Sequence, residues 1–111
     1  MTPDEFRSIA LSMPGAVESA HMGHPDFRVH DKIFATLGYP DAGWGVVMLT
    51  PEEQQDFIDT KHAVFELAPG AWGRKGSTRV RLEDADEATV RNALEKAHRR
   101  LAAPKTKSKR V

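Results

Sequence analysis

The sequence contains no cysteine among its 111 residues. This absence excludes disulfide bonds and zinc sites built from thiolates, and it is typical of proteins from a reducing compartment, so we expect a cytoplasmic protein. The chain also has no apolar run near the roughly 20 residues that cross a bilayer, and its first residues lack the cationic and apolar pattern of a signal peptide. We therefore expect no membrane contact.

The sequence has no net charge either, because 16 Lys and Arg balance 16 Asp and Glu. This balance hides a strong asymmetry along the chain. Residues 1–60 hold 3 basic and 10 acidic residues, whereas residues 61–111 hold 13 basic and 6 acidic ones. Such a basic second half predicts an anionic partner but says nothing about the fold.

Three helices are predicted from start signals followed by apolar spacing. A capping box with Pro at the first helical position begins at Thr2, and apolar residues then recur at positions 6, 9, 10 and 13. The same signal at Thr50 predicts a second helix that ends near Lys61. A third helix is expected from about Asp84 to Pro104, with a long apolar stripe.

Five strands are predicted between these helices, at residues 26–30, 33–37, 44–50, 64–67 and 77–82. Gly23 and Pro25 favour a loop over 18–24, and residues 70–76 also have the composition of a loop. The expected fold is an α+β domain of two layers, with an antiparallel sheet, helices on one face and the order α-β-β-β-α-β-β-α. We assign residues 1–104 to this domain and residues 105–111 to a disordered basic tail.

Four segments carry a family resemblance: Glu18–His21, His24–Val29, Lys32–Leu37 and Pro69–Thr78. Through them, residues 1–104 resemble the MmcQ/YjbR family. The resemblance implies a small α+β domain similar in architecture to type III secretion chaperones, and members of this family are usually described as DNA-binding. Many relatives carry an aromatic residue after the glycine that corresponds to Gly76, where this chain has Ser77 and Thr78.

The basic residues give the first functional hypothesis, which is non-specific binding of DNA phosphates. The candidate contacts lie in the fifth strand, its approach loop, the last helix and the tail: Arg74, Lys75, Arg79, Arg81, Arg99, Arg100, Lys105 and Lys107. Two simpler interpretations remain open. The strand arginines fit a solvated strand face, and cations at the end of a helix complement its dipole without any ligand.

The alternative hypothesis is a non-catalytic binding module for a small molecule or a protein partner. Its candidate pocket consists of Glu18, His21, His24, Asp26, Arg28 and Trp72. Trp72 either stacks on a base or caps the edge of the core, and the second interpretation is favoured here. No metal or cofactor is predicted, because the helical His-Glu-x-x-His pattern is absent. No catalytic signature is found, so an enzyme is not expected, and the oligomeric state stays open.

Overall fold

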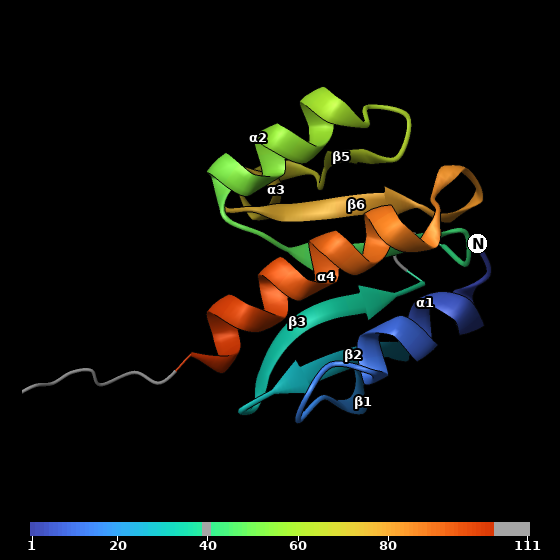
Figure 1. The fold of residues 1–111 in the computed structure, drawn as a ribbon, viewed down its shortest axis with the longest axis vertical. Coiled ribbons are helices and arrows are strands. Elements are labelled where there is room, and N and C mark those ends of the chain that lie inside the picture. Colours follow the sequence, from blue (N-terminus) through green and yellow to red (C-terminus); the bar gives the residue numbers. More distant parts are fainter. Residues whose placement is uncertain (39–40, 104–111) are drawn as a thin grey trace, which may run out of the picture.

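The computed structural model describes residues 1–38 and 41–103, whose strands form one six-stranded sheet in the order β1-β2-β3-β4-β6-β5 (Figure 1). The strand bounds are Val17–His21 (β1), His24–Val29 (β2), Lys32–Leu37 (β3), Trp44–Met48 (β4), Phe65–Leu67 (β5) and Ser77–Arg81 (β6). Every neighbouring pair is antiparallel. The predicted α+β class and the order of its elements are confirmed.

The helical elements are α1 (Pro3–Leu11), α2 (Pro51–Thr60), α3 (Gly70–Arg74), the 3-10 turn η1 (Leu82–Asp84) and α4 (Glu87–Ala102). Both predicted capping boxes are present, one between Thr2 and Glu5 and one between Thr50 and Glu53. The last helix starts slightly later than predicted, because Asp86 caps it with a 2.7 Å bond from a backbone N–H in the first turn. Within the described residues, no helix is long and apolar enough to span a bilayer.

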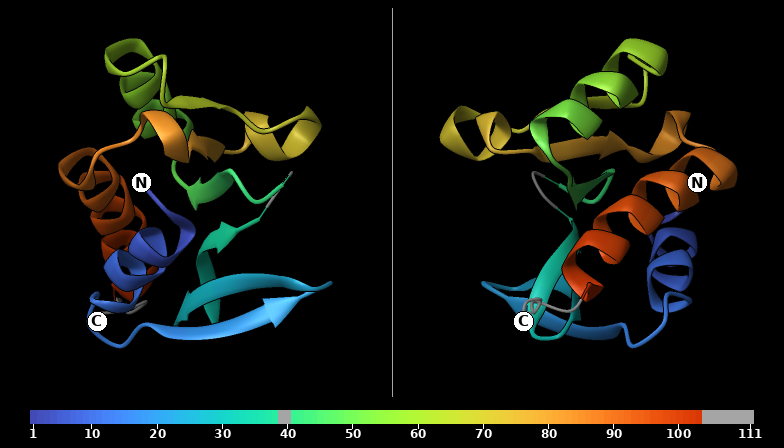
Figure 2. Two further views of the ribbon diagram at one scale, coloured as in Figure 1. Left: turned by 90° about the vertical axis from the view of Figure 1, so that its right-hand side faces the viewer. Right: turned by 60° about the vertical axis from the view of Figure 1, so that its left-hand side comes forward.

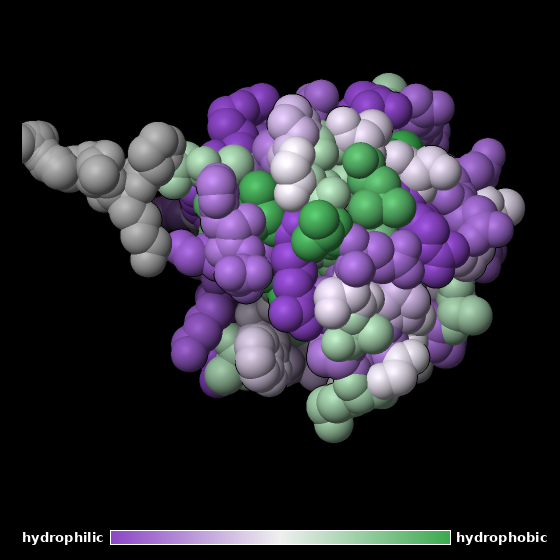
Figure 3. Space-filling model, turned by 90° about the horizontal axis from the view of Figure 1, so that it is seen from below, coloured by the Kyte–Doolittle hydropathy of each residue, from purple (hydrophilic) through white to green (hydrophobic). Residues whose placement is uncertain are grey.

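Strand β1, helix α3 and the short 3-10 turn η1 are the regular elements that the sequence did not predict. The expected loop over 18–24 was wrong because Met22 and Gly23, with φ of 50° and 82°, form a tight turn between β1 and β2. Pro25 is tolerated there because β3 pairs with β2 only from Asp26 onward. Strand β1 lies at a sheet edge and shows no buried alternation, and this end of the molecule exposes apolar surface bordered by polar side chains (Figure 3).

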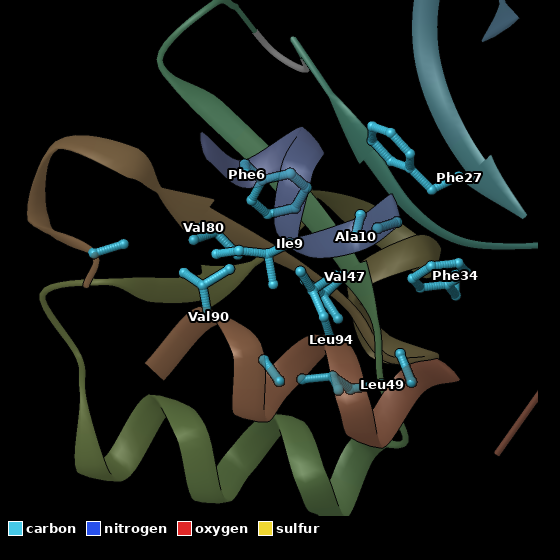
Figure 4. Close-up of a cluster of buried hydrophobic side chains, with 14 of the residues drawn as sticks. Phe6, Ile9, Ala10, Phe27, Phe34, Val47, Leu49, Val80, Val90 and Leu94 are labelled. Atoms are coloured by element: carbon cyan, nitrogen blue, oxygen red, sulfur yellow. The ribbon is translucent and has the colours of Figure 1, made fainter. Parts of the chain in front are cut away.

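Helices α1 and α4 lie side by side on one face of the sheet, where they enclose the core (Figures 1 and 4). The predicted apolar stripes supply it, since Phe6, Ile9, Val90 and Leu94 are all buried. Helix α2 packs on β5, with the rings of Phe57 and Phe65 5.0 Å apart between centroids. Apolar sheet residues such as Phe27, Ala35, Val47 and Val80 face these helices, and the buried Thr78 accepts a 3.1 Å bond from Gln54 of α2.

The opposite face of the sheet carries none of α1, α2 and α4, and we call it the open face (Figure 2). Directly paired residues of neighbouring strands point to the same side, so the strand registers define a row across all six strands. That row consists of Ser19, Asp26, Thr36, Val46, Arg79 and Glu66. Its three middle residues from Asp26 to Val46 are buried, whereas Arg79 and Glu66 reach solvent. Pairing thus brings the first and last strands of the chain onto one surface.

Candidate functional site

Two strand arginines and one tryptophan form a cluster on the open face. The guanidinium carbons of Arg79 and Arg81 lie 4.6 and 4.5 Å from the ring centroid of Trp44, within cation–π range. Both arginines share Glu66, at 3.5 and 3.4 Å, and Arg81 also lies 3.6 Å from Asp84. The Arg79 Nε is buried and finds no hydrogen-bond acceptor in the described part of the chain. The cluster therefore keeps one unsatisfied donor.

A second polar cluster on the open face centres on Asp26, which is fully buried. Its Oδ1 accepts a 2.8 Å bond from Arg28 Nε, and its Oδ2 accepts a 3.0 Å bond from Arg28 Nη2. His21 Nδ1 lies 2.8 Å from the same Oδ2. The hydrogen bonds from Arg28 hold the pKa of Asp26 below its usual range, burial opposes them, and the His21 contact lowers this pKa further. A buried, ionised carboxylate thus fixes the positions of Arg28 and His21.

The predicted pocket is only partly assembled. His21 and His24 face each other across the β1–β2 turn, with ring centroids 6.4 Å apart, beside the Asp26 cluster. Glu18 points to the other face of the sheet, where its carboxylate accepts a 3.1 Å bond from Arg7 Nε. Trp72 belongs to a separate element, α3. Among the described residues, no group of three or more His, Asp or Glu is placed to hold a metal ion.

Surface cavities lie in the helical layer. A cavity of about 360 Å³ is lined by α1, the N-terminal residue and the start of α4. Another of about 240 Å³ is lined by residues of α2 and α4 with Lys61. Neither includes a residue of the His21–Arg28 segment.

Helix α3 lies on the same side of the sheet as the open face (Figure 2). The expectation that Trp72 caps the edge of the core was wrong, because 74% of this residue is exposed. Arg74 and Lys75 follow directly and are exposed as well. Two predicted phosphate contacts, Arg74 and Lys75, and one residue of the predicted pocket, Trp72, thus form one short, solvent-facing unit.

The cations of the last helix do not join this unit. Arg100 donates to a Glu53 carboxylate oxygen at 3.0 Å and to the Met48 carbonyl at 2.6 Å. Arg99 is exposed on α4, in the helical layer. The structure therefore separates both residues from Arg79 and Arg81. Lys105, Lys107, Pro104 and the predicted tail over 105–111 lie outside the described residues.

Charge is distributed unequally between the two sides of the sheet. On the helical side, α1, α2 and α4 together hold eight acidic and five basic side chains, and the acidic excess comes from α1 and α2. The open-face strand positions, with α3 and Lys75, hold five cations and two carboxylates: Arg28, Arg74, Lys75, Arg79 and Arg81 against Asp26 and Glu66. The sequence showed an asymmetry between two halves of the chain. Only the strand registers place Trp44 beside the basic residues of β6, and they put Arg28 on the same face of the sheet, three strands away.

A model of the YjbR family matches residues 11–100, which is most of the chain. The chain belongs to the YjbR family. The match includes all six strands and α3, so every open-face residue discussed above lies inside the YjbR domain. A search of curated proteins finds no match. The resemblance expected from the sequence is confirmed, and the role of this YjbR domain has to be argued from its surface.

Proposed function

We propose that this YjbR protein binds nucleic acid through phosphate contacts made by its open face and by α3. The observation that carries this proposal is the excess of cations on one side of the sheet, where five cations stand against Asp26, Glu66 and the Asp84 that lies 3.6 Å from Arg81. Backbone contacts of this kind hold a nucleic acid without reading its sequence. The proposed role is binding and not catalysis, and the cytoplasmic location expected from the absence of cysteine fits it.

The ion pairs on the open face are compatible with a phosphate ligand. Glu66 forms ion pairs with Arg79 and Arg81 at distances of 3.4 Å or more, and 44% of its side chain is exposed. Ion pairs of such length and exposure contribute little to stability. The acidic helices α1 and α2, on the other side, would repel the same ligand.

The first test is salt-dependent binding of a fluorescein-labelled 20-mer duplex, followed by anisotropy with the full chain. We expect about three of the five cations to contact phosphates at one time. Three contacts predict that the dissociation constant rises roughly 40-fold between 50 and 200 mM salt. The double variant R74A/K75A removes two exposed cations of the proposed surface. We expect it to bind roughly tenfold more weakly at 50 mM salt and to lower the salt slope by about two.

The matched control is K96A/R99A, which removes two cations from α4 on the other side of the sheet. Its affinity should stay within about twofold of the parent. Equal losses in both double variants would show that net charge alone drives association. Absence of binding at 50 mM salt would eliminate the proposed function.

A second candidate function, binding of a small anion, is favoured by the network around Asp26. This buried carboxylate holds Arg28 and His21 in fixed positions on the open face, as a receptor for a small anionic group requires. A panel of phosphate and carboxylate compounds should then raise the melting temperature of the parent. The variants R28A and H21A should each remove that rise. Shifts that persist in both variants would exclude this site.

A further inference from the structure

The two most exposed large apolar residues in the described chain lie in segments that project on the open-face side. Met22 is 90% exposed in the β1–β2 turn, and Trp72 is 74% exposed on α3. Figure 2 shows both segments extending from the same side of the sheet, away from α1 and α4. An exposed indole combines a large apolar ring with an N–H donor, a combination that is enriched at binding interfaces.

The position of α3 is tightly constrained, so Trp72 is presented by a fixed element. A Cβ atom on Gly73 would lie 1.8 Å from the Ala68 carbonyl oxygen, so the helix backbone rests directly on the preceding loop. A Cβ on Gly76 would lie 1.7 Å from the Leu49 carbonyl oxygen, which fixes the other end of the unit. The buried Gln54 side chain also donates to the Gly73 carbonyl at 2.9 Å. Little conformational entropy remains to be lost when a ligand meets this element.

The charged neighbours of Trp72 define the chemistry of its partner. Arg74 and Lys75 follow it in the chain and are exposed, and the described residues of α3 include no acidic side chain. An aromatic ring next to cations matches a nucleotide, which offers a flat base and a phosphate. In a duplex, however, the faces of the bases are covered by their neighbours in the stack, so an indole reaches them only where strands are unpaired.

We propose that the preferred ligand is single-stranded nucleic acid, with Trp72 stacked on an unpaired base while the open-face cations follow the backbone. This inference rests on the proposed function and specifies its substrate class. Base stacking on an aromatic side chain tolerates any sequence, because every base has a flat face. The proposed binding is therefore selective for strandedness and not for sequence.

The experiment compares a labelled single-stranded 20-mer with a duplex of the same sequence at 50 mM salt, using the full-length protein. We expect the parent to bind the single strand more tightly than the duplex. W72A should weaken single-strand binding roughly 5- to 100-fold and change duplex binding by less than about twofold. W72F should keep most of the affinity, whereas W72L, which has apolar bulk but no aromatic face, should behave like W72A.

The outcomes separate this inference from the function on which it rests. Salt-sensitive binding of both ligands with no effect of W72A would overturn stacking but leave phosphate binding intact, and the exposed indole would then fit a protein partner better. Equal affinities of W72L and W72F would also overturn it, because the contact would be merely apolar. If neither ligand binds, both proposals fail. Circular dichroism and melting temperatures of the variants should match the parent, since Trp72 is exposed.

Discussion

G76A is expected to lower the free energy of unfolding by about 3 kcal/mol or more. Two independent effects act at this glycine. Its φ of 118° lies in a region that side chains rarely adopt, and an added Cβ would lie 1.7 Å from the backbone oxygen of Leu49. Backbone cannot move aside as the end of a side chain can. Gly76 also links the end of β4 to the start of β6, because its carbonyl accepts a 3.0 Å bond from the Leu49 N–H.

Urea unfolding of G76A beside G23A measures this effect with a matched substitution. Gly23 also has a positive φ, of 82°, but an added Cβ there meets nothing within 4 Å. G23A should therefore cost only about 1 kcal/mol, from backbone conformation alone. A loss of 3 kcal/mol corresponds to a drop of roughly 12 °C in melting temperature for a chain of this size. Similar losses in both variants would mean that the close approach at Gly76 is relieved by backbone movement.

D26N is expected to lower the free energy of unfolding at pH 7 by roughly 2 to 3 kcal/mol. The substitution keeps the shape of the side chain but removes the charge that accepts two hydrogen bonds from Arg28. An amide nitrogen would also face donors of Arg28 or His21. The loss stays below that of a fully buried pair because 30% of the Arg28 side chain is exposed and can be hydrated. The control D4N, at an 88% exposed carboxylate, should change stability by less than about 0.5 kcal/mol.

The difference in unfolding free energy between the parent and D26N should become smaller as the pH falls. The hydrogen bonds from Arg28 hold the pKa of Asp26 in the folded protein below its pKa in the unfolded chain, so the folded state binds fewer protons at this site than the unfolded state. The stabilisation is fully present above the unfolded pKa and is lost as the pH falls through the folded pKa. Urea unfolding at pH 7, 5 and 3 should show a constant difference at the two higher values and a smaller one at pH 3. A difference that does not change with pH would contradict the assignment of the ionised form.

Local signals in the sequence predicted the helices well because those signals act over three or four residues. Thr2 and Thr50 cap the helices that follow them, and the apolar spacing after each cap matches the buried face. Strand β1 was missed for a physical reason. An edge strand pairs on one side only, and residues 17–21 are mostly exposed, so burial leaves no alternating pattern there. Helix α3 was missed because Gly70 and Gly73 favour a loop, whereas close contact with Ala68 requires the second glycine.

The candidate site was predicted in pieces. The sequence placed Arg79 and Arg81 on one strand face and Asp26 and Arg28 in another group. The two groups belonged to different functional hypotheses. The registers of β2, β3, β4 and β6 place both groups on one face. No local pattern contains this information, because it depends on which strands pair and with what offset.

By itself, the sequence determined the α+β class, the YjbR family, the starts of α1 and α2 and the polarity of charge along the chain. The tertiary structure decided where that charge acts in space. It separated Arg99 and Arg100 from the strand arginines, turned Glu18 toward Arg7, and exposed Trp72 beside Arg74. The physical reason is that helix signals depend on residues a few positions apart, whereas a surface formed by six strands depends on hydrogen-bonded registers between segments distant in sequence.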